Sequence, residues 1–244
     1  MIQMKTIVLA AGKGTRLGEI CAHTPKPLVK LGGEPVLVHN LRWLADFGIT
    51  DVKINLHHLG DRIEATIGDG SQFGVSVHYS RESELLGTAG TVADLREWID
   101  GETYLVVYGD NRHDFDLHKL LEDHESNLGL GTLAVFSLES HQHTGLAGGK
   151  VEMDSSNRIL RFIEERPEPS LHLINAGCYV LAPGLLDAIG SDRPVDFGKA
   201  VFPRVLREQI LCGHVIDGRC LGIDTPDALA SAQALLRGEE GVAG

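Results

Sequence analysis

The chain has 244 residues and carries 34 acidic against 22 basic side chains, a formal net charge of −12. This length fits one large α/β domain, and so acidic a surface repels DNA and RNA, so no nucleic-acid partner is expected. No apolar run approaches the ~20 residues of a membrane span, nothing at the N-terminus is typical of a signal peptide, and four scattered cysteines form no Cys-x-x-Cys pair. We therefore expect a cytoplasmic protein with reduced thiols and no membrane partner.

Strand-like and helical patterns alternate through the first 110 residues. Apolar spacing predicts buried strands at 5–10 and 104–108, further strands at 52–56 and 75–79, and helices at 35–47, 59–67 and 92–99. This regular alternation is typical of a mostly parallel sheet with helices packed on it. It predicts a three-layer α/β/α, Rossmann-like fold with a mixed, mainly parallel central sheet.

The pattern changes after about residue 130. Two strand-like runs, 150–153 and 159–163, flank a hairpin turn, and 173–181 reads as another strand. The closing helix is predicted to have Thr225 as its N-cap, Pro226 as its first residue and Gly238 at its end. We expect one domain over 1–238, in which 131–238 extends the sheet of 1–130, and a flexible tail over 239–244.

The main chemical signal is the run from Leu9 to Leu17, followed by Pro25-Lys26-Pro27-Leu28. Gly12 and Gly14 lack side chains, so backbone N–H groups there can approach a ligand closely. Arg16 and Lys26 add two cations, and the flanking prolines restrict the direction of Lys26. The spacing matches neither the dinucleotide fingerprint nor the P-loop. Two placed cations beside such a loop are typical of a polyphosphate site.

Other polar residues are candidate metal ligands or nucleophiles. Asp110 follows a buried strand, at the edge where α/β sheets bind ligands. His57 and His58 are adjacent on a strand-like run and point to opposite faces, while His141 and His143 have no third ligand nearby. A surface loop is the better interpretation of that histidine pair. The contexts of Cys178 and Cys220 favour packing over catalysis.

Gly-x-Gly-Thr-Arg-Leu followed by Pro-Lys-Pro-Leu resembles the signature of the sugar-1-phosphate nucleotidylyltransferases, which join a nucleoside triphosphate to a sugar 1-phosphate and release pyrophosphate. The resemblance covers nearly the whole chain. Further segments match that family in order, namely the nucleobase loop at 84–90, the metal-aspartate strand end at 106–110, the sugar-phosphate segment at 162–165, the Asn-Ala-Gly-x-Tyr strand at 175–179, and 223–226.

The resemblance implies a nucleotide-binding half over 1–130 and a sugar-binding half with a closing helix over 131–238. It implies that Arg16 and Lys26 are catalytic and that Asp110 and Asp224 bind Mg²⁺. The nucleotide-binding residues that it implies are Leu9, Ala10, Ala11, Gly12, Gly14, Thr15, Glu84, Gly87 and Thr88. The sugar-binding residues that it implies are Asn111, Gly149, Glu164 and Asn175. The expected partners are an NTP and a sugar 1-phosphate, and the expected state is a monomer or a homodimer.

Two positions depart from the family pattern. Glu165 stands where the family has a lysine, and Arg166 follows one place later. The family's second metal aspartate falls on Gly222, with Asp224 two places on. Asp224 could reach the metal directly, act through a bridging water, or help to cap the helix that begins near Thr225.

The base and the sugar stay open. The Leu-Gly-Thr-Ala-Gly string resembles mannose-1-phosphate and heptose-1-phosphate guanylyltransferases, which favours GTP with a manno-configured sugar. The segment 59–79 also resembles uridylyltransferases that act on amino-sugar phosphates, and thymidylyl or cytidylyl transfer are further alternatives. A phosphocholine-type cytidylyltransferase would need more aromatic side chains than the 5% present. A non-catalytic nucleotide-sugar-binding module would be expected to have lost Arg16, Lys26 or Asp110.

Overall fold

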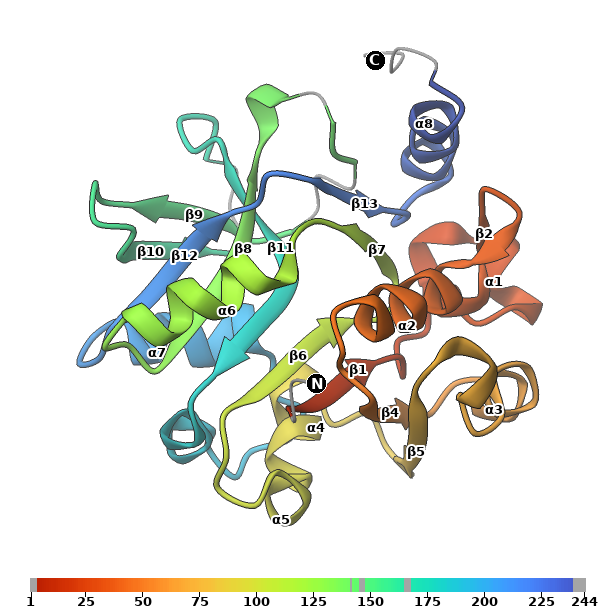
Figure 1. Cartoon of the computed structure of the whole chain (residues 1–244), viewed down its shortest axis with the longest axis horizontal. Coiled ribbons are helices and arrows are strands. Elements are labelled where there is room, and N and C mark those ends of the chain that lie inside the picture. Colours follow the sequence, from red (N-terminus) through yellow and green to blue (C-terminus); the bar gives the residue numbers. More distant parts are fainter. Residues whose placement is uncertain (1–3, 141, 145–147, 165–167, 239–244) are drawn as a thin grey trace.

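The computed structural model describes residues 4–140, 142–144, 148–164 and 168–238. Within these residues, a nine-stranded sheet has the order β10-β9-β11-β6-β1-β4-β5, and β8 and β12 join it through β11 (Figure 1). Only β10 and β11 run against β6, so seven of the nine strands share one direction. The expected mixed, mainly parallel sheet is confirmed. The strands of this sheet are β1 (Lys5–Leu9), β4 (Asp51–Leu56), β5 (Ser76–Arg81), β6 (Tyr104–Tyr108), β8 (Gly131–Ser137), β9 (Lys150–Met153), β10 (Ile159–Ile163), β11 (Leu173–Leu181) and β12 (Leu211–Val215).

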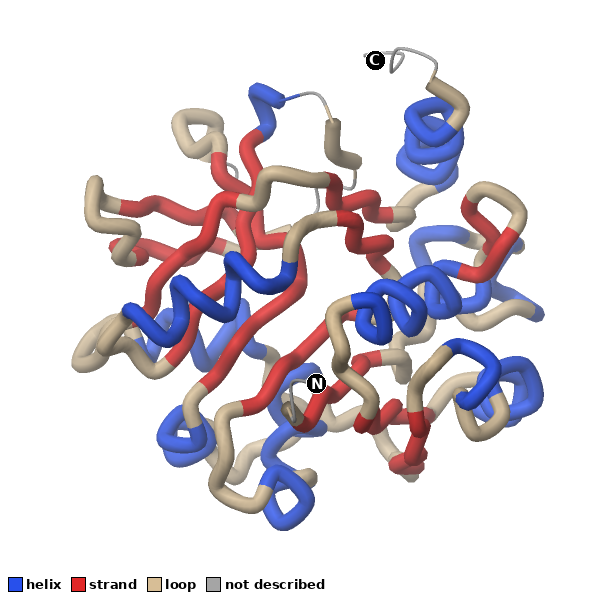
Figure 2. Tube along the Cα trace, in the orientation of Figure 1, coloured by secondary structure: helices blue, strands red, loops and turns tan. Residues whose placement is uncertain are grey.

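Helices cover both faces of the sheet, which gives three layers (Figure 2). Side chains alternate along a strand, so Val8 of β1 faces one helical layer while Ile7 and Leu9 face the other. The first layer contains α2 (Val36–Asp46), α3 (Gly60–Ile67) and α6 (Leu117–Ser126); the second contains α4 (Thr88–Asp94), α5 (Arg96–Ile99) and α7 (Phe202–Val205). The helix expected over 92–99 is therefore two helices, because Leu95 leaves helical geometry at φ −93° and ψ 10°.

The second half extends the same sheet, as the sequence predicts. β9 and β10 form the expected antiparallel hairpin, and β11 pairs with β6. Outside the main sheet, β13 (Arg219–Gly222) pairs antiparallel with β7 (Asn111–Asp114), which places Gly222 opposite Asn111. This pairing carries the chain after β13 back to the end of β6, which is where the site forms.

A third small cluster of buried side chains joins the N-terminal segment to the closing helix α8 (Pro226–Leu236). It includes Cys21 of α1 (Ile20–His23) and Leu31 of the short strand β2 (Lys30–Leu31), which pairs with β3 (Glu34–Pro35). Thr225 caps α8, since its hydroxyl accepts a hydrogen bond from the Ala228 N–H at 3.2 Å. The predicted cap is confirmed, whereas the tail predicted over 239–244 lies outside the described residues. Among the described residues, no helix has the length and apolar character needed to cross a bilayer.

Helix α2 holds the segment that follows β6. The Asn40 amide donates to the Asn111 carbonyl at 2.7 Å and accepts from the His113 N–H at 3.1 Å. His113 is 2% exposed, and its ring centroid lies 5.4 Å from that of Trp43. Burial lowers the pKa of His113 to about 4, although the charge of Asp110 opposes that shift.

This pKa makes the stability of the fold depend on pH. The unfolded chain binds a proton at His113 near pH 6.5, while the folded chain binds it only near pH 4. Burial of neutral His113 therefore carries no protonation cost above pH 6.5. As the pH falls from 6.5 toward 4, the free energy of unfolding decreases by up to about 3 kcal/mol, because the unfolded chain binds the proton first. We predict that His113→Gln flattens the pH dependence of the free energy of unfolding in this window, measured by urea denaturation. The control variant His172→Gln, at an exposed position, should keep the wild-type slope. Equal slopes for wild type and His113→Gln would contradict the prediction.

Candidate active site

The glycine-rich loop after β1 packs tightly on the segment that carries Lys26. Gly14 has φ 63°, and a Cβ there would lie 2.8 Å from the Cys21 sulfur and 3.0 Å from Lys26 Cβ. A glycine is required at this position because a side chain would clash and the backbone is left-handed. Gly12 and Thr15 are exposed on the same loop, whereas Leu9, Ala10 and Ala11 are buried. The loop borders an open cavity of about 320 Å³, lined by Lys13, Thr15, Gly18, Cys21, Ala22 and His58.

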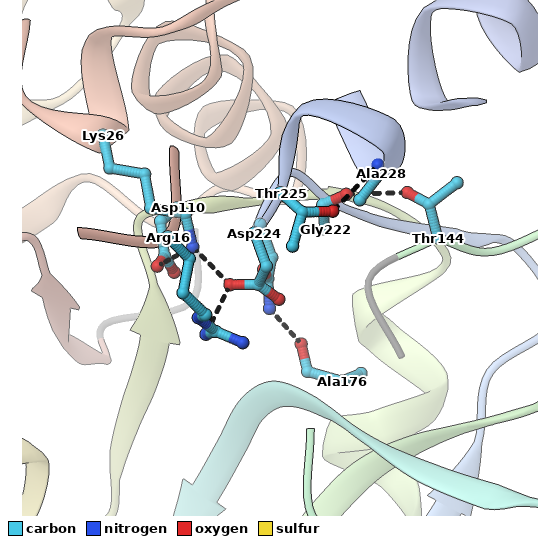
Figure 3. A network of polar contacts seen from close by, with 10 residues as sticks. Arg16, Lys26, Asp110, Thr144, Ala176, Gly222, Asp224, Thr225 and Ala228 are labelled. Atoms are coloured by element: carbon cyan, nitrogen blue, oxygen red, sulfur yellow. Dashed lines mark hydrogen bonds and ion pairs between the residues drawn. The ribbon is translucent and has the colours of Figure 1, made fainter. Parts of the chain in front are cut away.

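Four charged side chains meet where the two halves of the chain join (Figure 3). The Lys26 ammonium lies 2.7 Å from Asp110 Oδ2 and 2.6 Å from Asp224 Oδ1. The Arg16 guanidinium donates to the same Asp224 oxygen at 2.9 Å. The structure thus brings together both predicted catalytic cations and both predicted metal carboxylates.

The electrostatics of this cluster are set by the burial of Lys26. Its side chain is only 7% exposed, and burial alone would lower the pKa of the ammonium. The two carboxylates oppose this effect and keep the pKa of Lys26 above its ordinary value. The ammonium is therefore charged at neutral pH. Two positive and two negative groups leave the cluster close to neutral.

The position of Asp224 follows from the strand that precedes it. Leu221 and Ile223 are fully buried in the cluster beneath α8. Neighbouring side chains point in opposite directions in extended chain, so Asp224 turns away from that cluster and toward Lys26. Thr225 caps α8, so the alternative in which Asp224 caps this helix is not what the structure shows.

A cavity of about 120 Å³ adjoins the charged cluster. Its lining includes Arg16, Asp110 and Asp224. It also includes three of the predicted sugar-binding residues, Asn111, Glu164 and Asn175. The fourth, Gly149, lies beside them, since a Cβ on Gly149 would be 2.7 Å from Glu164 Oε2. The full lining is Arg16, Tyr108, Asp110, Asn111, Phe136, Thr144, Gly148, Glu164, Asn175, Gly177, Cys220 and Asp224.

An irregularity in β11 shapes the floor of this cavity. The pairing of β11 with β8 shifts register between Asn175 and Tyr179, as in a β-bulge. Gly177 lies within it at φ 73°. The Asn175 amide donates to the Tyr179 hydroxyl at 2.6 Å and accepts from the Gly177 N–H at 3.0 Å. These contacts fix the orientation of Asn175 at the cavity.

The predicted base loop lies apart from the cavity. Glu84 is exposed, whereas Gly87 and Thr88 contact the segment before α7. The Thr88 N–H donates to Asp196 at 3.0 Å, and a Cβ on Gly87 would clash with the backbone of Val195. Gly87 and Thr88 thus hold the loop in place, and the exposed part of the loop begins with Glu84.

Several residues at or near the site are not among those predicted from the sequence. Tyr108 and Thr144 line the cavity, and the Thr144 hydroxyl donates to the Gly222 carbonyl at 2.8 Å, two residues before Asp224. Asn55 is a buried amide behind the loops. In the sequence it is only one of the polar residues that alternate with apolar ones along β4. Glu165 and Arg166 lie outside the described residues.

The remaining histidine and cysteine interpretations can be compared with the structure. The His143 ring stacks on Phe136 with centroids 4.5 Å apart and accepts from the Cys220 N–H at 3.1 Å, so it packs rather than forming the exposed loop expected. Cys178 and Cys220 are buried, as expected for packing residues. In the described ranges, no three His, Cys, Asp or Glu side chains group as a metal site. His141 lies outside those ranges.

Comparisons with known proteins identify relatives over nearly the whole chain. Residues 5–236 match the family described as nucleotidyl transferase. A mannose-1-phosphate guanylyltransferase from Mycobacterium tuberculosis is 33% identical over 97% of this chain, and mannose-1-phosphate guanyltransferase beta-B from Xenopus laevis is 31% identical over 91% of it. The chain spans 66% and 62% of the lengths of these two relatives.

Solved structures give the same fold. The structure of HddC from Yersinia pseudotuberculosis complexed with GMP-PN has a TM-score of 0.80, at 22% identity, over 96% of this chain and 100% of that one. At this level of identity the likeness concerns the fold alone.

The bulge at Gly177 generates a prediction. A Cβ on Gly177 would lie 2.9 Å from the Tyr108 ring and 3.1 Å from the Asn111 amide, so Gly177→Ala should be strained by both its φ and these contacts. We predict a loss of about 2–4 kcal/mol in the free energy of unfolding, measured with urea. Gly101→Ala is the matched control, because Gly101 has φ 74° with nothing within 4 Å of a Cβ. A loss no larger than that of the control would show that the contacts with Tyr108 and Asn111 are easily relieved.

Proposed function

The chain belongs to the nucleotidyl transferase family, and on that premise we propose that it transfers a nucleotidyl group from an NTP to a sugar 1-phosphate and releases pyrophosphate. The observation that carries this proposal is the contact of Arg16 and Lys26 with Asp110 and Asp224 beside the cavity. Phosphoryl-type transfer depends on in-line positioning and on neutralising phosphate oxygens more than on a covalent partner. Two fixed cations beside a pocket lined with amides and a carboxylate meet that need.

The two cations have separate tasks in this proposal. An oxygen of the sugar phosphate attacks the α-phosphorus, and the bond from that phosphorus to the bridging oxygen of pyrophosphate breaks. Lys26 is buried and held in one direction, so it suits the α-phosphate, at which attack takes place. Arg16 is 56% exposed and reaches out from the glycine-rich loop, so it suits the charge that develops on the leaving pyrophosphate.

The two carboxylates fit a divalent cation. Asp110 and Asp224 each direct one oxygen at the Lys26 ammonium, so both already converge on one positive charge. Mg²⁺ is commonly held by one or two carboxylates together with substrate phosphates, and two hard oxygen donors match that pattern. We infer that Asp110 and Asp224 would hold Mg²⁺, which when bound would neutralise phosphate charge. The near-neutral cluster supports this inference. The two carboxylates already balance the two cations, so a triphosphate needs additional positive charge to bind.

The names of the relatives support GTP and a manno-configured sugar 1-phosphate as the substrates. The cavity residues Asn111, Glu164 and Asn175 offer donors and acceptors to sugar hydroxyls, and the exposed Glu84 can accept from a guanine N–H. The resemblance of 59–79 to uridylyltransferases keeps UTP as the second candidate. In the structure this segment contains α3 and the turn before β5, and Gly70 packs there against Val75 and Val77.

Loss of either cation should remove most turnover. We predict that Lys26→Ala and Arg16→Ala each lower kcat by about 10²–10³-fold, since each removes a group that stabilises charge in the transition state. Pyrophosphate release at saturating substrates measures the effect, and circular dichroism confirms folding. Lys13→Ala removes an exposed cation from the same loop and should keep most of the activity. Near-normal turnover of a folded Lys26→Ala or Arg16→Ala variant would disprove its assigned role.

Substrate choice is tested by a matrix of ATP, GTP, CTP, UTP and dTTP against several sugar 1-phosphates, read by pyrophosphate release. GTP with mannose 1-phosphate should give a kcat/KM at least about tenfold above other pairs, as expected when a base edge is read by hydrogen bonds. A preference for UTP would refute the guanine assignment and keep the reaction class. No pyrophosphate release with any pair would refute the proposed reaction.

A further inference from the structure

Behind the glycine-rich loop and the base loop lies a polar network, formed by the buried Asn55 and Thr91 and the half-buried Glu82, that the proposed mechanism does not use. We propose that Asn55 and Glu82 are positioning residues, which hold these two loops at a fixed separation so that one nucleotide can bind to both. The proposal rests on the proposed function, because it concerns how an NTP would be held. Neither residue contacts the reacting atoms in it.

Asn55 connects the network to the glycine-rich loop. It lies near the end of β4, and the residue is 3% exposed. Its Oδ1 accepts from the Ala10 N–H at 2.7 Å, at the point where β1 ends and the loop begins. Its Nδ2 donates to Glu82 Oε1 at 2.8 Å and to the Thr91 hydroxyl at 3.0 Å. Both donor hydrogens and the carbonyl oxygen of this amide thus bind to other segments.

Glu82 connects the network to the base loop. It follows β5, and its Oε1 accepts from the Thr91 hydroxyl at 2.5 Å as well as from Asn55. Its Oε2 accepts from the Leu86 N–H at 3.3 Å, within the predicted base loop. Asn55 and Glu82 therefore join the end of β1, the base loop and helix α4 through five hydrogen bonds.

A network of this kind fixes distances that apolar packing would leave adjustable. Hydrogen bonds in a buried setting are directional, and a partly satisfied network costs more than a fully satisfied one. A ligand that touches both loops gains affinity from their preorganisation, since it does not have to order them itself. A ligand that touches only the glycine-rich loop gains much less. The network should therefore favour NTP binding over binding of the triphosphate alone.

A residue exchange tests this idea. Asn55→Asp keeps the acceptor for the Ala10 N–H but places two carboxylates next to each other. Glu82→Gln places its amide N–H groups opposite another donor, either the Asn55 amide or the Leu86 N–H. In the double variant Asn55→Asp/Glu82→Gln, the glutamine can donate to the aspartate and to Thr91 and still accept from Leu86. Calorimetry would measure the Kd of the preferred NTP and of inorganic tripolyphosphate, and steady-state kinetics the KM of the sugar 1-phosphate.

We expect each single variant to raise the Kd for the NTP roughly tenfold, the effect of about one lost buried hydrogen bond. The Kd for tripolyphosphate in Glu82→Gln and the KM for the sugar 1-phosphate should stay within about twofold of wild type. The double variant should recover NTP affinity to within about threefold. Val77→Ala, which truncates a buried side chain of β5, should lower the melting temperature without changing any of these constants.

Three results would overturn the inference, and they can be told apart from failure of the proposed function. Unchanged NTP affinity in both single variants would show that the network does not position the loops. Equal losses for NTP and tripolyphosphate in Glu82→Gln would reduce its role to the stability of the phosphate site. A double variant no better than the single variants would exclude the exchange of partners. If the wild-type protein binds none of the five NTPs, the proposed function itself fails.

Discussion

The Lys26 ammonium lies between two carboxylates from distant parts of the chain, and the geometry of the site depends on this contact. Asp110 arrives at the end of the buried strand β6, and Asp224 arrives through the pairing of β13 with β7. Burying an ammonium costs free energy unless it is paired and hydrogen-bonded. Asp110 and Asp224 both meet this need for Lys26. The two halves of the chain are thereby joined at the site.

The same contact explains how so acidic a chain can offer a site for an anion. A net charge of −12 disfavours a triphosphate at long range, so the site must supply its own positive charge. Arg16 and Lys26 supply it, but Asp110 and Asp224 balance it in the free protein. A divalent cation that takes over the carboxylates would free both side chains for phosphate oxygens. The geometry thus connects the acidic pair, the basic pair and the metal requirement of the proposed reaction.

The sequence predicted those parts of the fold and site that depend on local pattern. The strands at 5–10 and 104–108 and the helix at 35–47 are recognisable because their apolar spacing is set by burial within one element. Local pattern does not determine the place of Asp224, because it depends on the pairing of β13 with a strand more than a hundred residues earlier. Asn55 has no local signal, because it is one of several polar residues that alternate along β4, and only its contacts with Ala10 and Glu82 distinguish it. The positions of Asp224 and Asn55 at the site therefore depend on long-range contacts, which local sequence pattern does not predict.

The central claim is that Asp110 and Asp224 together hold the cation that accompanies the nucleotide. Electron paramagnetic resonance of Mn²⁺, titrated into the protein with the NTP bound and no sugar 1-phosphate present, measures this directly. The account predicts that Asp110→Asn and Asp224→Asn each weaken Mn²⁺ binding at least about tenfold, because each removes a charged oxygen ligand. Asp114→Asn, which alters a nearby carboxylate paired with Arg219, should bind Mn²⁺ as the wild type does. Wild-type Mn²⁺ affinity in Asp224→Asn would contradict the account.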